Sequence, residues 1–215
     1  MIVSSRTPRA GVLIVALMVF LDAGRPAAAD PALRLKASGV GGARVSLTIE
    51  LIRWSTDIER APLVTALTAP SPAPAAPAAP AGGRGGRGGR GGAPPPSPMA
   101  RLTTAVKAAP TVGFIWGAGP TGYSIKYAWR SASADGQERL VLVTDRRLGA
   151  HVLPAPSIPG PAGDLEFTVI EARINGQGAG EARTSLAAAV VVDAAAKTLA
   201  LDGYDAAPVH LKVSR

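Results

Sequence analysis

Few side chains in this sequence could carry out catalysis or bind a metal ion. The chain has two histidines, His151 and His210, and no cysteine, which excludes disulfides and thiolate metal sites. No other ligand type groups around these histidines, so we predict no metal site and no cofactor. Asp57, Glu59 and Asp145 remain as carboxylates that can serve as general acids or bases. A hydrolase or an isomerase is the enzyme class that this set suits.

Four aromatic residues are candidates for binding an apolar ligand. Tyr123, Tyr127 and Trp129 alternate with polar residues, which predicts a strand with an aromatic row on one face. Trp54 precedes the candidate carboxylates Asp57 and Glu59. If the row faced the inside of a barrel, it would line an apolar pocket. The alternative is that the row fills a small barrel, whose interior is about wide enough for side chains alone.

These residues depend on a segment in which a strand runs directly into a helix. Apolar and polar residues alternate over residues 45–51, as in a strand with one buried face. Thr56 and Glu59 have the spacing of a capping box, and Asp57 adds a charge that the helix dipole favours. Pro62 lies beyond the first turn, which predicts a kink or a restart of the helix. Three apolar side chains would face the sheet: Ile58, Leu63 and Leu67.

The junction reads RWSTDIER, and its candidate residues are Arg53, Trp54, Ser55, Thr56, Asp57, Glu59 and Arg60. This motif resembles one in an uncharacterised group of small secreted bacterial β-rich proteins, which pair such a strand with a C-terminal set of strands. The resemblance covers residues 33–67 and 102–215. It implies a fold and an export route, and it implies no activity. The sequence itself favours a structural role, with Trp54 in the core and Arg60 on the surface.

Residues 1–29 have the pattern of a secretory signal peptide. Arg6 and Arg9 precede an apolar stretch at 11–21, and three alanines at 27–29 fit the small-residue cleavage rule. The apolar stretch is about half the roughly 20 residues that a spanning helix needs. We therefore predict a periplasmic or secreted protein with no stable membrane span after cleavage. The alternative is an uncleaved anchor.

The basic charge of the chain comes from the signal and from one insert. Without the signal, 20 basic and 14 acidic side chains remain, and Arg84, Arg87 and Arg90 supply three of the positive charges. These arginines lie at residues 69–98, an Ala/Pro-rich and Gly/Arg-rich segment that has too few large apolar residues to form a core. We predict a disordered insert that makes no specific nucleic-acid contact. The alternative is a weak contact with an anionic envelope surface.

The remaining residues, 30–68 and 99–215, are predicted to form one β-domain. About nine strands follow one another with mostly short connections, which favours an antiparallel meander. A continuous apolar run at 140–143 indicates a strand buried on both faces, and a change of phase within 165–174 predicts a β-bulge. The predicted fold is mainly β (α+β), a barrel or strongly curved sheet with one or two short helices packed on it. A two-sheet sandwich is the alternative.

The functional expectation is an exported, non-catalytic β-domain that binds a small apolar ligand or a protein partner in the cell envelope. The long loop at 145–163 is the predicted contact surface, because binding residues concentrate on loops held by a rigid scaffold. The alternative is an envelope hydrolase or isomerase that uses Asp57, Glu59 and Asp145. The sequence leaves the oligomeric state open.

Export gives the first testable prediction. The mature N-terminus is expected to be Asp30, because cleavage follows the three alanines. N-terminal sequencing of protein recovered from the periplasm or the medium checks this. Full-length protein found only in the cytosol or the inner membrane would contradict it.

Overall fold

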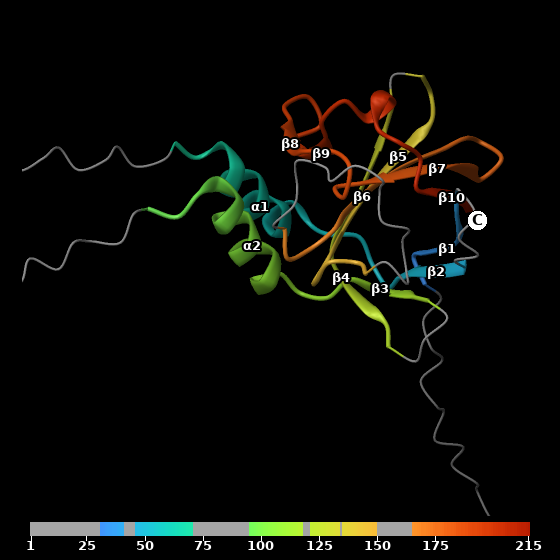
Figure 1. Ribbon diagram of the computed structural model, residues 1–215, viewed down its shortest axis with the longest axis horizontal. Coiled ribbons are helices and arrows are strands. Elements are labelled where there is room, and N and C mark those ends of the chain that lie inside the picture. The colour runs from blue at the N-terminus through green and yellow to red at the C-terminus, as the bar shows by residue number, and fades with distance from the viewer. Residues whose placement is uncertain (1–30, 41–45, 71–94, 118–120, 134, 150–164) are drawn as a thin grey trace, which may run out of the picture.

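Figure 1 shows a computed structural model of the protein, which describes residues 31–40, 46–70, 95–117, 121–133, 135–149 and 165–215. The strands of the main sheet are β1 (Leu33–Gly39), β2 (Ser46–Leu51), β3 (Gly113–Trp116), β4 (Tyr123–Ala132), β5 (Glu138–Thr144), β6 (Val169–Ile174), β7 (Ala179–Thr184) and β10 (Leu211–Ser214). The other elements are the helices α1 (Asp57–Thr68) and α2 (Pro98–Ala108), the strands β8 (Val190–Asp193) and β9 (Thr198–Leu201), and the short helix η1 (Tyr204–Ala206).

The eight main strands form a closed antiparallel barrel in the order β1-β10-β7-β6-β5-β4-β3-β2. Closure comes from β1, which pairs with β2 on one side and with β10 on the other. A closed barrel leaves no edge strand to pair with another chain. The predicted mainly β fold with a barrel and short helices is confirmed, and of the predicted alternatives the closed barrel is the one observed.

The barrel interior is filled by apolar side chains. Every one of the eight strands contributes to this core, because alternate residues of each strand point inward. Leu35 and Ile49, for example, face each other across β1 and β2 and are each 1% exposed. The expectation that side chains alone fill a barrel of this size agrees with this core.

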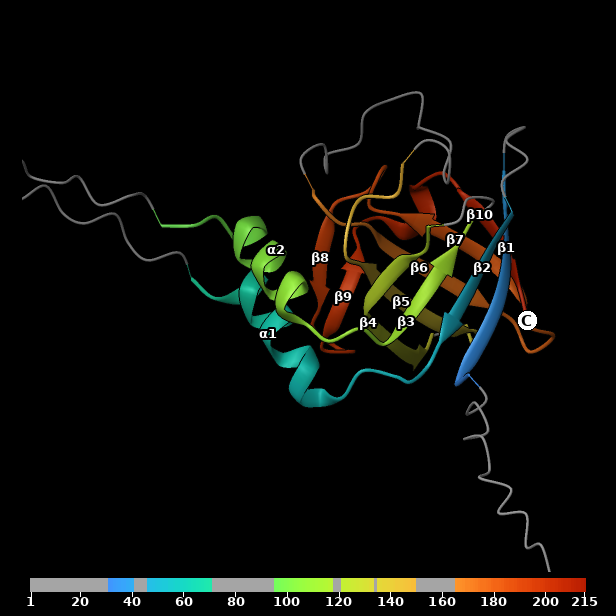
Figure 2. The same ribbon diagram turned by 90° about the horizontal axis from the view of Figure 1, so that it is seen from below.

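A second apolar core lies on the outer face of the barrel wall. Val141, Val143 and Val169 point outward from β5 and β6 and are buried beneath α1, α2 and the β8–β9 hairpin. Figure 2 shows the two helices and the hairpin together on one side of the barrel. The helix α1 belongs to this outer layer, because the outward-facing apolar residues there need a cover.

The run at 140–143 is buried on both faces, as predicted. Leu140 and Leu142 face the interior, and Val141 and Val143 face the outer layer. The bulge predicted within 165–174 is wrong, since β6 pairs with β5 and β7 without a shift. The apolar residues of this segment change phase because both faces of β6 are buried, one in the barrel interior and the other in the outer core. A register shift occurs in β4 instead, between Ile125 and Tyr127.

The segment at 184–193 is divided between two elements. Its start is the end of β7, its end is β8, and a turn lies between them. Most of β7 escaped prediction because its sequence, AGEART, lacks an apolar alternation. Its Gly180 permits close pairing with β6, since a Cβ at this position would lie 1.9 Å from the Arg173 carbonyl oxygen.

The helix α1 confirms the predicted capping box and corrects the predicted buried face. Thr56 accepts from the Glu59 N–H, and the Glu59 carboxylate accepts from the Thr56 N–H. The helix is continuous through Pro62, so the expected restart is not seen. Leu63 is buried and Leu67 packs on the outer core, whereas Ile58 is 85% exposed. Ile58 lies in the first turn, before the helix reaches its partners.

The helix α2 packs beside α1 and begins at Pro98. Arg101 joins the two helices at the ends where the insert connects them. Its Nε donates to the Ala66 carbonyl at 3.1 Å and its Nη2 donates to the Ala69 carbonyl at 2.8 Å. These bonds satisfy carbonyl groups at the C-terminus of α1 that have no partner within the helix.

Two sequence predictions lie mostly or wholly outside the described residues. The signal at 1–29 is one, and the insert at 69–98 is the other, of which 69–70 and 95–98 are described. No helix within the described ranges is long and apolar enough to cross a membrane.

The insert is expected to be dispensable for folding. Replacing residues 71–94 with a short Gly/Ser linker should change the free energy of unfolding by about 1 kcal/mol or less, because loop-closure entropy varies slowly with length and Arg101 already holds the two helix ends together. Circular dichroism and chemical denaturation measure the outcome. A loss of cooperative unfolding would show that the insert packs against the domain.

Candidate functional site

The residues of the RWSTDIER motif form a connection between the barrel and α1. Arg53 makes two hydrogen bonds to Glu59, from Nη1 to Oε2 at 2.8 Å and from Nη2 to Oε1 at 2.7 Å. Glu59 Oε2 also accepts from the Thr56 N–H at 2.8 Å. The hydrogen bonds from Arg53, and then from the Thr56 backbone, lower the pKa of Glu59 to about 2. The Glu59 carboxylate is therefore ionised and fully engaged in fixing the start of the helix.

Ser55 and Trp54 fix this connection to the barrel. The Ser55 N–H donates to the Ala128 carbonyl at 2.9 Å, and the Ser55 Oγ accepts from the Ala128 N–H at 3.0 Å. Trp54 packs on the barrel core, and the Arg130 guanidinium lies 5.2 Å from its ring centroid. Ser55 thus continues the pairing along β4 at Ala128, beyond the register shift between Ile125 and Tyr127.

Arg60 joins α1 to the outer layer of the barrel. It pairs with Asp57 at 2.6 Å, and its guanidinium lies 4.0 Å from the centroid of the Trp129 ring. Its Nη1 also approaches the Ala196 carbonyl, at 3.5 Å, in the turn between β8 and β9. Each candidate residue of the motif therefore has structural contacts, and Arg60, which was expected on the surface, is half-buried between Asp57 and Trp129.

The four candidate ligand-binding aromatics do not come together. Tyr123 faces the barrel interior, whereas Tyr127 belongs to the outer core and its hydroxyl lies 2.6 Å from Thr198 Oγ1. Burial raises the pKa of Tyr127 to about 12. Trp129 packs on the outer core and Trp54 on the inner one. The predicted single row is wrong, because the register shift in β4 turns Tyr127 and Trp129 to the face opposite Tyr123.

The candidate carboxylates also do not share a site. Asp57 and Glu59 are paired with Arg60 and Arg53 at the start of α1. Asp145 follows β5, and its N–H donates to Ser124 at the beginning of β4. None of the three lines any of the three pockets described below.

The histidines give no catalytic arrangement either. His151 lies outside the described residues, as does most of the long loop at 145–163. His210 is 4% exposed, and its Nδ1 lies 3.3 Å from Thr184 Oγ1. Burial, together with the nearby charge of Arg183, lowers the pKa of His210. Within the described ranges, no three residues of types that bind metal ions cluster together.

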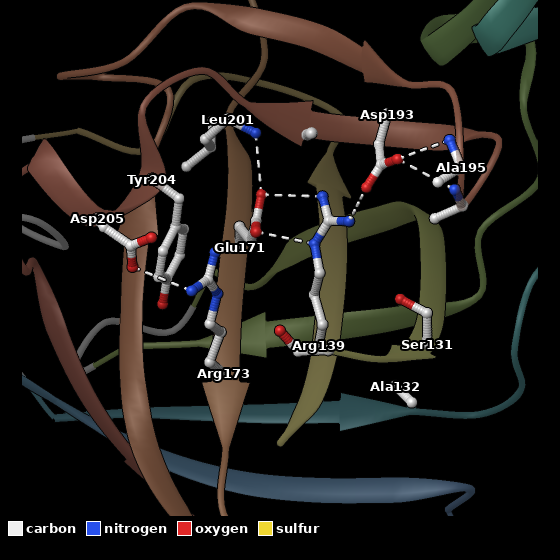
Figure 3. Close-up of a pocket in the computed structure, with 13 residues that line it drawn as sticks. Ser131, Ala132, Arg139, Glu171, Arg173, Asp193, Ala195, Leu201, Tyr204 and Asp205 are labelled. Carbon is white, nitrogen blue, oxygen red and sulfur yellow. Dashed lines mark hydrogen bonds and ion pairs between the residues drawn. The ribbon is translucent and has the colours of Figure 1, made fainter. Parts of the chain in front are cut away.

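The structure places its main pocket on the outer face of the barrel wall, in a position that the sequence did not predict. This pocket has a volume of about 640 Å³ and lies between β5, β6, the β8–β9 hairpin and η1. Figure 3 shows that charged side chains from β5 and β6 lie side by side in it. Two smaller pockets, of about 410 and 270 Å³, adjoin it and share some of its residues. We call the 640 Å³ pocket the outer pocket.

Arg139 is the more buried of the two arginines in the outer pocket, and three carboxylate oxygen atoms hold its guanidinium. Its Nε and Nη2 donate to the Glu171 carboxylate at 2.8 and 3.2 Å, and its Nη1 donates to Asp193 at 2.6 Å. Burial opposes this charge, but the bonds to Glu171 and Asp193 outweigh burial and hold the pKa of Arg139 above its ordinary value. The Leu201 N–H donates to Glu171 at 2.9 Å, so the same network fixes β9 to the barrel wall.

Arg173 lies directly opposite Arg139 in the sheet and has a weaker set of partners. Its Nη1 donates to Asp205 at 3.0 Å, but the Asp205 side chain is 82% exposed. The guanidinium lies 3.9 Å from the centroid of the Tyr204 ring, and its Nε is buried without a hydrogen-bond partner. Ser131, on the other side of Arg139, also has a buried hydroxyl with no partner.

The charged network of the outer pocket was not predicted from the sequence. Its carboxylate Glu171 is 1% exposed and accepts from Arg139. One signal was available, since Arg139 directly precedes the run buried on both faces. Asp193, the partner of Arg139 on β8, could not be found in this way, because its position depends on how the β8–β9 hairpin folds back onto the barrel wall.

The chain matches none of the protein-family models, curated proteins or solved structures with which it was compared. The family resemblance carried by residues 53–60 therefore stays a prediction.

The pairing of Glu59 predicts a pH-dependent contribution to stability. Its pKa of about 2 in the folded chain lies below the ordinary value of 4.5, so ionised Glu59 stabilises the fold above pH 4.5. That contribution is lost as the pH falls from 4.5 towards 2. Glu59→Gln should cost about 1 kcal/mol at pH 7, because the Arg53 side chain is 41% exposed and solvent screens the pair.

Chemical denaturation at pH 7 and pH 3 measures this difference. The gap between the wild-type protein and Glu59→Gln should narrow by more than half at pH 3. Glu50→Gln, at an exposed cross-strand pair with Arg34, is the control and should change stability by less than about 0.5 kcal/mol at pH 7. A gap for Glu59→Gln that stays constant with pH would show that the carboxylate charge contributes nothing.

Proposed function

We propose that this protein is an exported, non-catalytic β-domain that binds a small ligand or a protein partner in the cell envelope, and that its binding site is the outer pocket. The observation that carries the proposal is the pair of unsatisfied buried polar groups in this pocket, the Nε of Arg173 and the hydroxyl of Ser131. An unpaired buried polar group costs about 1–3 kcal/mol, so both groups favour an occupant that supplies hydrogen-bond acceptors.

The size of the outer pocket fits this role. Its volume of about 640 Å³ lies within the range of roughly 300–1,000 Å³ that is typical of small-molecule sites. Small apolar side chains, including Ala195 and Ala200, line part of it beside the charged groups. In such a site the apolar wall provides affinity, and the few polar groups orient the ligand.

The barrel interior supports the proposal less well as a site. The apolar ligand expected from the sequence depended on Trp54, Tyr123, Tyr127 and Trp129 lining one cavity, and these residues divide between two cores. The inward side chains of all eight strands fill the interior. The proposed occupant is therefore one that enters from the outer face of the wall.

The hydrolase or isomerase alternative has less support from the described residues. Asp57 and Glu59 hold arginines at the start of α1, and Glu59 is a poor base because its bonds to Arg53 and Thr56 lower its pKa to about 2. Asp145 is bonded near the beginning of β4, away from them. An enzyme of this class would need these groups to converge on one concave surface.

Blocking the outer pocket tests the proposal. Ala195 is an exposed residue of the β8–β9 turn that lines the pocket, and the neighbouring Ala194 is exposed and lines none of the three pockets. Mature wild-type protein, Ala195→Trp and Ala194→Trp would be recovered from the same envelope. Native mass spectrometry would detect a retained small molecule, and affinity capture would detect a retained protein.

The expected result is an occupant that the wild-type protein and Ala194→Trp retain and that Ala195→Trp loses. An occupant that all three proteins retain equally would place binding elsewhere and contradict the proposal. A protein with no occupant, whose turnover of a hydrolase substrate is abolished by Asp57→Asn, would favour the enzyme alternative.

A further inference from the structure

We propose that the outer pocket binds a carboxylate carried on a short apolar stem, and that Arg173 is the residue that receives the carboxylate. This inference rests on the proposed function and names the chemistry of the occupant. The two arginines of the pocket, Arg139 and Arg173, face each other on adjacent strands, but only Arg139 has a complete set of buried partners. The difference between them identifies the position at which an anion is missing.

Arg173 is held ready for a planar acceptor. Its guanidinium rests on the Tyr204 ring at 3.9 Å, and Tyr204 is fixed in turn because its hydroxyl donates to the Glu181 carbonyl at 3.0 Å. Tyr204 is 6% exposed, so this support is part of the folded wall. An arginine fixed in this way loses little conformational entropy on binding and presents a fork that matches a carboxylate.

Asp205 occupies the place of the missing anion only weakly. Its Oδ1 accepts from Arg173 at 3.0 Å, yet the side chain is 82% exposed. Ion pairs this exposed typically contribute about 0–1 kcal/mol, so a ligand carboxylate can displace Asp205 at small cost. Figure 3 shows Asp205 on the Tyr204 side of Arg173, away from the Arg139 network.

The charge of the pocket favours a carboxylate over a phosphate. Arg139 already serves two carboxylates, Glu171 and Asp193, so that group has an excess of one negative charge. A ligand carboxylate adds only one negative charge at Arg173, and the displaced Asp205 side chain, already 82% exposed, stays charged in water. A phosphate dianion would add a second negative charge beside Glu171, where like charges repel.

The rest of the pocket indicates the stem. Five apolar side chains line it and would pack against a short acyl or aliphatic group: Ala132, Ala195, Ala196, Ala200 and Leu201. The hydroxyl of Ser131 is on β4, two strands from Arg173 on β6. Neighbouring strands lie about 4.8 Å apart, which places this hydroxyl on the order of 10 Å from the carboxylate position, within reach of a polar atom at the far end of the ligand.

The test uses four probes with the mature wild-type protein and follows binding by calorimetry. Hexanoate carries the carboxylate on an acyl stem, and N-acetyl-alanyl-alanyl-leucine carries it at a peptide terminus. The amide of each is the neutral counterpart. We expect at least one acid to bind at least tenfold more tightly than its amide, because a charge-assisted bond to Arg173 is lost in the amide. The acid that binds more tightly identifies the source of the ligand.

Two substitutions with opposite expected effects make the test specific. Arg173→Gln should weaken binding of the acid at least tenfold. Asp205→Asn should strengthen it two- to fivefold, because it removes the competing carboxylate. Arg183→Gln is the matched control, since Arg183 also lies over the Tyr204 ring, at 4.2 Å, but does not line the outer pocket. Its effect should stay within threefold.

Circular dichroism checks that each variant is folded. If Arg173→Gln does not fold, the result for Asp205→Asn still tests the inference. Equal binding of acids and amides, no binding of any probe, or weaker binding by Asp205→Asn would overturn the inference. Loss of a natural occupant in Ala195→Trp would still support the proposed function in each of these cases, so the two failures are distinguishable.

Discussion

The burial of β5 on both faces is the constraint on which the rest of the structure depends. Leu140 and Leu142 complete the barrel interior, but Val141 and Val143 leave an apolar surface on the outside. At roughly 25 cal/mol per Å² of apolar surface, leaving these side chains in water would cost several kcal/mol. The helices α1 and α2 and the β8–β9 hairpin cover them. The second layer therefore follows from the sequence of one strand.

Long connections between neighbouring strands supply that layer. The strands β2 and β3 are adjacent, as are β7 and β10, and two residues are enough to join adjacent antiparallel strands. Here residues 52–112 and 185–210 lie between them and contain both helices and the hairpin. The RWSTDIER motif begins the first connection, and Arg60 reaches from it to the turn of the hairpin in the second. The motif thus acts on the outer pocket indirectly, through the position of the hairpin.

The sequence predicted the elements whose causes are local. The capping box of Thr56 and Glu59 requires only their spacing, and the double burial of β5 requires only a continuous apolar run. Features that depend on distant partners were not predicted. The bulge in β4 reverses the direction of Tyr127, and the Ser55 side chain that bonds to Ala128 beside it is 73 positions away in the sequence. Arg139 looks like a surface residue until Glu171 and Asp193 are known to meet it.

Arg139 and Arg173 are the same residue type on adjacent strands, but only Arg139 has all of its guanidinium nitrogens bonded within the fold. Desolvating a charge costs several kcal/mol, and Arg139 offsets this cost with bonds to Glu171, Asp193 and the β9 backbone. Since Glu171 also accepts from the Leu201 N–H, this network orients the hairpin and leaves no vacancy for a ligand. Arg173 stays at the border of the layer, with a buried Nε that has no acceptor. A filled barrel interior cannot supply that acceptor, so the proposed ligand would meet Arg173 where the added layer joins the wall.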